Sequence, residues 1–302
     1  MTDRIDLSPG GAATLGRDEW SSRVRSVLAA AVYVAALALA FAVHGLTPQR
    51  YLLVLLAPAL VLRSARRYLF DFVPFAFLIV IYAQCRALAH AVRPDPYYLP
   101  QLELERWLFG GHVPSSALQQ WLWTGSEHWY DHTLVLVTRI HAYVPITLAF
   151  LLWLKRRALF YRFAASVLAA SFAAAAVFVV YPAAPPWAAG REGLVDVTRI
   201  GAGGGDPNPY AAIPSLHAGY AFLVFLMLAS LAWRSRHRAA LVAAAAVYPA
   251  LQSFAVVYTG NHYVVDLVAG YAVAAAAFFG VARLERQRHL AEAVRPVEVG
   301  AS

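Results

Sequence analysis

The stretch GNHYVVDLVAGYAVAAAAFFGVA, residues 260–282, has a histidine and an aspartate near its start and is apolar from there to its end. Its apolar part, 263–282, has the roughly 20 residues that an α-helix needs to cross the hydrocarbon layer of a membrane. Asp266 is the only charged residue in the stretch. The stretch therefore predicts a membrane-spanning helix with two ionisable groups at its start.

Seven further apolar runs continue this pattern along the 302 residues, which are 60% hydrophobic and 14% charged. Ordinary soluble domains are about 45–50% apolar and about 25% charged. The runs are 24–46, 51–62, 68–90, 133–153, 163–181, 216–232 and 239–258. Only the second is too short for a simple span, and we expect it as a tilted span or an interfacial element. The sequence predicts an all-α fold, a polytopic transmembrane helical bundle of about six to eight spans.

Polarity divides the chain into four predicted parts. Residues 1–22 form a polar N-terminal tail, and 23–131 hold the N-terminal spans and an outer interfacial loop. Residues 132–283 form a membrane core that contains all the candidate site residues, and 284–302 form a polar C-terminal tail.

The formal charge of +8 comes from basic residues that gather in short clusters between the apolar runs. Such clusters mark cytoplasmic loops, so we expect a membrane-embedded protein and no nucleic-acid partner. With the N-terminus inside, the loops 91–132 and 182–214 lie outside. The first of them is rich in tryptophan, which favours the level of the lipid headgroups, and predicts short interfacial helices. The single cysteine, Cys85, excludes an intramolecular disulfide and a cysteine-built zinc site.

His262 and Asp266 are four residues apart, so their side chains share one face of the predicted helix. A carboxylate beside an imidazole can hold one ring nitrogen protonated and leave the other free to act. Ionisable groups at the edge of a span are costly and point to function. The alternative is a hydrogen-bonded interfacial histidine beside an aspartate that caps the helix.

Ser215 and His217 begin another predicted span, in IPSLHAGYAF at 213–222. The amides of a first helical turn have no partner within the helix, and with the serine hydroxyl they could hold a phosphate. His217 could then protonate a leaving oxygen. Proline and serine also start helices without any catalytic role, which is the alternative. A third segment, YPAAPPW at 181–187, is predicted on the same outer face.

The segments AAPPW, PSLHAG and HYVVDLVAG, in this order, resemble the motifs of the type 2 phosphatidic acid phosphatase (PAP2) superfamily over residues 130–282. Their wording is closest to its branch of inositol phosphorylceramide synthases and inositolphosphotransferase-like proteins. The resemblance implies that His262 attacks phosphorus to form a phosphohistidine, that Asp266 orients it, and that His217 protonates the departing alcohol. It also implies that Ser215 helps to bind phosphate and that neither a metal nor another cofactor takes part.

The chain departs from the superfamily pattern in its basic residues. Lys155 and Arg162 have the spacing of the first motif, but Phe163 replaces its proline and the predicted topology puts them on the cytoplasmic face. Val256 stands where the superfamily has an arginine, six residues before the nucleophilic histidine. Positive charge for the phosphoryl oxygens must then come from elsewhere, and the substrate-binding candidates are Arg191, Arg139 and His141.

Together these features predict a lipid-phosphate phosphatase or phosphotransferase at the extracytoplasmic face of a bacterial cell membrane. Its substrate would be a lipid phosphate or phospholipid, and a transferase would need an alcohol acceptor such as inositol. One alternative is a proton-coupled transporter or lipid flippase, which would have broken, symmetric helix pairs near the midplane. The other alternative is a catalytically inactive scaffold. The absence of the superfamily's basic residues supports this alternative.

Overall fold

The computed structural model describes residues 17–44, 47–92, 95–190, 193–200 and 210–294, and these ranges are mostly helical, with no strand beyond two isolated β-bridges. The chain forms two compact units, Met1–Ala76 and Phe77–Ser302. The α-helices are α1 (Arg17–His44), α2 (Pro48–Val61), α3 (Ala65–Val92), α4 (Pro100–Leu108), α5 (Pro114–Leu122), α6 (Trp129–Arg139), α7 (Tyr143–Lys155), α8 (Arg157–Val180), α9 (Leu216–Ala232), α10 (Arg238–Tyr258) and α11 (Val264–Val294). Short 3₁₀ turns are η1 (Ile140–Ala142), η2 (Pro186–Ala189) and η3 (Val197–Arg199).

In the first unit, α1 and α2 pack against each other. The hydroxyl groups of Tyr33 and Tyr51 lie 2.7 Å apart between these two helices. The Tyr68 hydroxyl, from the first turn of α3, donates to the Leu52 carbonyl oxygen at 2.6 Å. Buried polar groups need such partners, and these bonds join the three helical segments of the unit.

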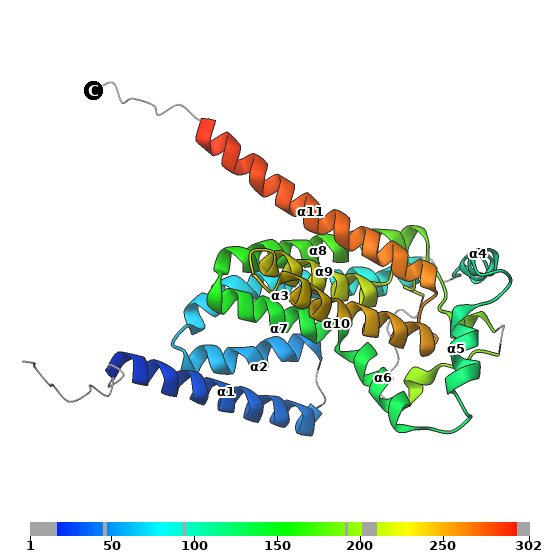
Figure 1. The fold of residues 1–302 in the computed structure, drawn as a ribbon, viewed down its shortest axis with the longest axis horizontal. Coiled ribbons are helices and arrows are strands. Elements are labelled where there is room, and N and C mark those ends of the chain that lie inside the picture. The colour runs from blue at the N-terminus through cyan, green and yellow to red at the C-terminus, as the bar shows by residue number, and fades with distance from the viewer. Residues whose placement is uncertain (1–16, 45–46, 93–94, 191–192, 201–209, 295–302) are drawn as a thin grey trace, which may run out of the picture. The chain divides into compact units, whose positions relative to one another are not determined.

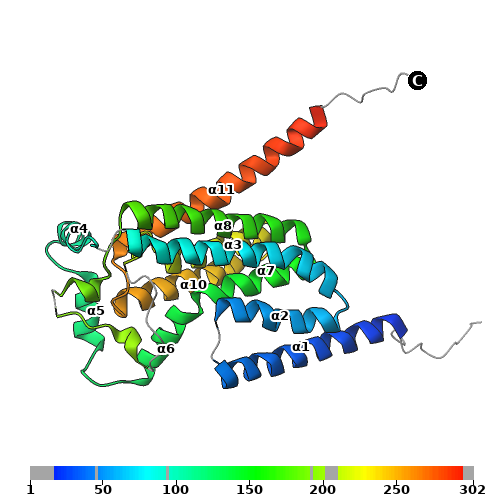
Figure 2. The ribbon, with the colours of Figure 1, turned by 180° about the vertical axis from the view of Figure 1, so that it is seen from behind.

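In the second unit, α7, α8, α10 and α11 surround α9, which contacts each of them (Figure 1, Figure 2). This central place explains why α9 is apolar on all sides. The short helices α4 and α5 and the start of α6 gather at one end of this bundle (Figure 1). There α4 contacts α11, while α5 and α6 contact α10.

The helical arrangement confirms the predicted all-α fold. Within the described residues, six stretches are long and apolar enough to cross a membrane: Ser21–Ala40, Ala65–Ala89, Trp129–Lys155, Arg157–Val180, Arg238–Tyr258 and Val264–Glu292. The helices α2 and α9 are apolar but shorter. Of the predicted polar tails, residues 1–16 and 295–302 lie outside the described residues.

The predicted span at 133–153 is not one continuous α-helix, because η1 separates α6 from α7. Pro145 lies in the first turn of α7. Proline has no amide hydrogen, and its ring clashes with the carbonyl group four residues earlier, which here belongs to His141. The interruption therefore falls at His141, in the middle of a membrane-spanning stretch.

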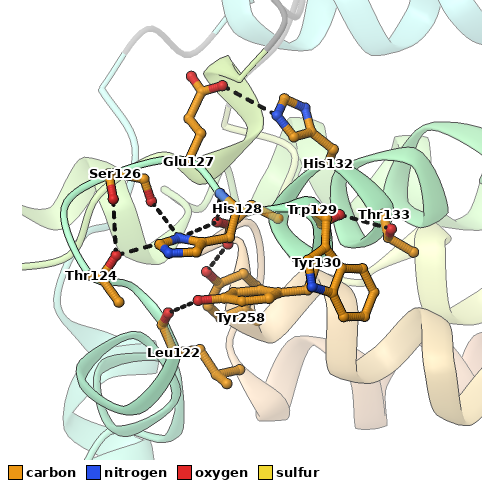
Figure 3. A network of polar contacts seen from close by, with 11 residues as sticks. Leu122, Thr124, Ser126, Glu127, His128, Trp129, Tyr130, His132, Thr133 and Tyr258 are labelled. Carbon is orange, nitrogen blue, oxygen red and sulfur yellow. Dashed lines mark hydrogen bonds and ion pairs between the residues drawn. The ribbon is translucent and has the colours of Figure 1, made fainter.

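The end of α10 is held by a polar network at the start of α6 (Figure 3). The backbone N–H of His128 donates to the Asp131 carboxylate at 2.8 Å, and the Tyr258 hydroxyl donates to the other oxygen of the same carboxylate. The Tyr130 hydroxyl donates to the Leu122 carbonyl oxygen at 2.7 Å. Since Asp131 is buried, its two oxygens need these donors. Tyr258 is the last residue of α10, so the network fixes the point from which the chain turns toward residue 262.

Candidate active site

The three motif segments predicted on one face of the membrane meet in the second unit. Ala183 forms parallel β-bridges with Tyr97 on one side and with Ala211 on the other. The Trp187 N–H, from the same segment, donates to the carbonyl oxygen of Gly260 at 3.3 Å. The YPAAPPW segment therefore lies between the turn before residue 262 and the segment that leads into α9.

His217 and His262 contact each other directly at the centre of this arrangement. His262 Nε2 lies 3.0 Å from His217 Nδ1, and His262 Nδ1 lies 3.6 Å from Asp266 Oδ2. The Asp266 carboxylate is completely buried and also accepts the Tyr263 N–H at 2.9 Å. A hydrogen on His262 Nδ1, facing the carboxylate, leaves Nε2 as the nitrogen with a lone pair. The structure thus forms the chain Asp266, His262, His217.

A tight turn brings His262 to this position. The α10 helix ends at Tyr258, and Gly260 follows with a φ of 76°, a left-handed conformation that favours glycine. The Gln119 amide Nε2 donates to the carbonyl oxygens of Tyr258 and Val195, each at 2.9 Å. Because Gln119 lies on α5, this outer helix holds the turn on one side while the Tyr258 hydroxyl holds it on the other.

The helices α9 and α11 cross so closely that His217 and His262 can touch. The Ser215 N–H donates to the Asp266 carbonyl oxygen at 3.0 Å. A Cβ atom on Gly270 would lie 2.2 Å from the Ser215 carbonyl oxygen, and one on Gly219 would lie 3.2 Å from the Gly270 oxygen. Small residues allow such close packing of helices in membranes. The glycines of PSLHAG and HYVVDLVAG therefore set the distance between the two histidines.

We expect Gly270→Ala to lower kcat/KM by about 10²-fold, because displacing α9 or α11 by about 1 Å would separate the reacting groups. The measurement is the initial rate of purified, folded protein in detergent. The control is Gly280→Ala on the same helix, where an added Cβ meets nothing within 4 Å. Equal rates for the two variants would show that this crossing does not set the catalytic geometry.

Ser215 is the N-cap of α9, as its place before the helix predicts. Its hydroxyl oxygen accepts the Ala218 N–H at 3.3 Å, and the residue is fully buried. A hydroxyl group that accepts one bond still has its proton to donate. The capping bond accounts for a serine at this position, and phosphate binding by Ser215 remains a prediction.

His141 is brought to the site by the break between α6 and α7. Its ring centre lies 3.9 Å from that of His217, and its Nδ1 lies 2.7 Å from the Thr138 carbonyl oxygen. A carbonyl oxygen only accepts, so Nδ1 carries the hydrogen in that pair. His141 also stacks on Tyr220, whose hydroxyl lies 2.7 Å from Ser171 Oγ. Three histidines from η1, α9 and the turn before α11 thus form one row.

Arg139 makes a different set of contacts. Its Nη2 donates to the carbonyl oxygens of Thr198 and Ile200 at 3.1 and 3.0 Å. These bonds hold the loop around η3 against the end of α6, and they account for an arginine here without a substrate. Arg191, the other predicted arginine, lies outside the described residues.

A further cation, Arg86, was not predicted as a site residue but interacts electrostatically with the site. Arg86, on α3, is near enough to both His217 and Tyr220 to act on them electrostatically. Tyr82 lies one helical turn before Arg86 and bonds to the Tyr220 hydroxyl, which places this face of α3 beside the row of histidines. The available signal was an arginine inside the predicted span 68–90, since charges within spans are rare.

The Lys155 and Arg162 pair, set aside on topology, belongs to the other end of the bundle. Arg162 Nε lies 2.5 Å from Glu285 Oε2. Glu285 and Asp266 are both on α11 and 19 residues apart, which corresponds to about 28 Å along a helix. Arg162 therefore has a local acidic partner far from the histidines.

The arrangement has the parts of covalent catalysis: a nitrogen nucleophile, a carboxylate that orients it, and a second ionisable group beside it. Among the described residues, no group of three or more His, Cys, Asp or Glu side chains is placed to hold a metal ion.

Comparison with protein families gives a match to this chain. Residues 101–280 match the family model of the PAP2 superfamily. The comparisons with curated proteins and with solved structures found no match.

Proposed function

The chain belongs to the PAP2 superfamily, an assignment that suggests lipid phosphatase or phosphotransferase activity, and from it we propose a metal-independent enzyme that acts through a phosphohistidine on His262. The observation that carries the proposal is the chain of Asp266, His262 and His217, with 3.6 and 3.0 Å between successive side chains. The long apolar helices and the superfamily assignment make the chain an integral membrane protein.

In the proposed first step, the Nε2 lone pair of His262 attacks phosphorus, and the bond from phosphorus to the departing oxygen breaks. The electron pair of that bond goes to the oxygen, which takes a proton from His217. Asp266 stabilises the positive charge that develops on the His262 ring. Since Nε2 and His217 Nδ1 are 3.0 Å apart, these two nitrogens must separate for a phosphoryl group to enter between them.

In the second step, an oxygen nucleophile attacks the phosphohistidine, gives its proton to His217 and breaks the bond between phosphorus and Nε2. Water as the nucleophile makes the protein a phosphatase, and an alcohol makes it a transferase. We propose a lipid phosphate or phospholipid as donor. The motif wording supports an inositolphosphotransferase-like enzyme, with inositol as one acceptor to test.

We propose that Arg86, together with His141, supplies the positive charge for the phosphoryl oxygens that the missing arginine at position 256 would have given. Support comes from the place of Arg86 beside His217 and from the contact of His141 with the same ring. Arg139, which binds carbonyl oxygens, supports the loop in this proposal.

We propose further that the active site opens at the extracytoplasmic face of a bacterial cell membrane. The helices α4, α5 and α6 bear the exposed tryptophans Trp107, Trp121 and Trp129 at the histidine end of the bundle. Tryptophan is typical of the membrane interface. The basic residues that follow the positive-inside rule gather around the opposite helix ends, for example at 155–157.

The test is phosphate release and headgroup transfer by the purified protein from lipid phosphates, polyprenyl diphosphates and phosphatidylinositol, with and without a chelator. We expect turnover that the chelator does not reduce, because the nucleophile is a side chain and not a metal-bound water. Transfer to inositol that exceeds hydrolysis would identify a transferase. Turnover lost with the chelator and restored by a divalent cation would contradict the metal-independent mechanism, and silence on the whole panel would favour a transporter or an inactive scaffold.

A further inference from the structure

The short helix α4 has two unlike faces. Its outward side chains include Leu104, Trp107 and Leu108, which are 45%, 78% and 51% exposed. Gln101, Leu102 and Glu105 are buried on the opposite face. An amphipathic helix with exposed tryptophan and leucine is suited to the membrane interface. A fully buried glutamate on its inner face requires a separate explanation, since glutamate is rarely buried without a partner.

Glu105 contacts the start of the helix that follows His262. Its Oε1 accepts the backbone N–H of Val264, the first residue of α11, and the carboxylate also bonds to the N–H of Val265. The first amides of a helix have no partner within the helix. A negative charge there is also stabilised by the helix dipole. Glu105 therefore caps α11 from another segment of the chain, 159 residues away from Val264.

This cap leaves Asp266 able to serve His262. Asp266 Oδ2 already accepts the Tyr263 N–H at 2.9 Å and faces His262 Nδ1 at 3.6 Å. A carboxylate that also had to cap the next two amides would have less capacity for the imidazole. Glu105 accepts from those two amides, so one carboxylate caps the helix while the other orients His262. Tyr263 packs against Leu102 of α4, which adds an apolar contact between the same two segments.

The geometry points to Glu105 as a positioning residue for the nucleophile: from the interfacial helix α4 it fixes the first turn of α11, and thereby the orientation of His262 and Asp266. The inference rests on the proposed function. It adds a requirement that the motifs do not contain, namely that α4 must be docked for the site to be aligned.

The protonation of Glu105 provides a readout that a simple packing role would not. Burial raises the pKa of Glu105 to about 7; the bonds from Val264 and Val265 oppose this, and the nearby charge of Asp266 adds to it. The ionisable group of α11 that acts on Glu105 is Asp266. In the unfolded chain a glutamate loses its proton near pH 4.5. Protonation of Glu105 therefore stabilises the folded state, because burial outweighs the two amide bonds that favour the charged form; this contribution is complete below pH 4.5 and is lost as the pH rises through about 7.

The experiment compares Glu105→Gln, Glu105→Ala and the control Glu103→Gln, which changes an exposed carboxylate on the same helix. The assay uses phosphatidic acid in detergent micelles, or the best donor of the panel, from pH about 5.5 to 8.5. We expect Glu105→Ala to lower kcat about 10- to 100-fold with KM little changed, as for residues that orient a catalytic group. Glutamine keeps an acceptor oxygen, so Glu105→Gln should recover most of kcat but lose any pH dependence near 7. Glu103→Gln should match the wild type.

A second measurement does not depend on activity. Amide hydrogen exchange of the peptide that covers 260–268 should become faster at Val264 and Val265 in Glu105→Ala and stay unchanged in Glu103→Gln. A lower melting temperature with wild-type kcat per folded molecule and wild-type exchange would overturn the inference. If the wild type is inactive on every donor, the proposed function fails; the exchange rates at Val264 and Val265 then still decide whether Glu105 positions this segment.

Discussion

His262→Ala is expected to abolish turnover, lowering kcat by about 10⁴- to 10⁶-fold, the range seen when a covalent nucleophile is removed. The substitution removes the imidazole ring that lies between the Asp266 carboxylate and His217. Neither neighbour is expected to replace it, since Asp266 is fully buried and His217 acts as the acid in the proposed mechanism. The measurement is the initial rate with the best donor, together with trapping of labelled phosphate on the protein.

The trapped adduct should have the acid lability of a phosphohistidine in the wild type and be absent in His262→Ala. Asp266→Asn tests the orienting carboxylate and should lower kcat by about 10⁴-fold, because an amide cannot stabilise the charged imidazole. His132→Ala is the matched control, as His132 is an exposed histidine near the same end of the bundle that pairs with Glu127 at 3.4 Å. Turnover by His262→Ala at the wild-type rate would contradict the assignment of the nucleophile.

The fold was predictable because a bilayer allows few kinds of backbone structure within it. Every backbone polar group within lipid must be paired inside its own segment, so long apolar runs have to become helices. The pair of His262 and Asp266 was predictable for a related reason, since a four-residue spacing places both on one face of a helix. These rules apply within one segment of the chain. They do not predict which helices pack against each other.

The remaining site residues depend on those neighbours. Arg86 and Glu105 were visible in the sequence, one as a charge in a span and the other as a glutamate in an amphipathic segment, but their relation to His217 and α11 comes from the packing of α3 and α4. The helix break at His141 could have been predicted locally from Pro145, but a continuous span was predicted there. Arg139 was predicted to bind substrate; the structure pairs it with carbonyl oxygens of the loop around η3, and substrate binding by Arg139 stays a prediction.

Arg86→Met is expected to lower kcat/KM by about 10²- to 10³-fold, the usual loss when one preorganised group that stabilises transition-state charge is removed. Methionine keeps an apolar side chain of similar length and removes the charge. During the transfer, the negative charge of the phosphoryl group lies on its oxygens. A cation in a water-poor site acts on that charge more strongly than it would in water. Arg86 acts electrostatically on both His217 and Tyr220.

Arg86→Lys separates charge from shape in this prediction. Lysine keeps the positive charge but cannot hold two oxygens in the planar, two-pronged geometry of a guanidinium, so we expect a loss between those of the wild type and Arg86→Met. Inhibition by inorganic phosphate should weaken in the same order, because the product contacts the same cation. Arg157→Met is the control, since Arg157 lies at the start of α8 and stacks on Tyr161. If Arg86→Met keeps both the rate and the phosphate inhibition of the wild type, another group balances the phosphoryl charge. His141, at the end of the row of histidines, would then be the next residue to test.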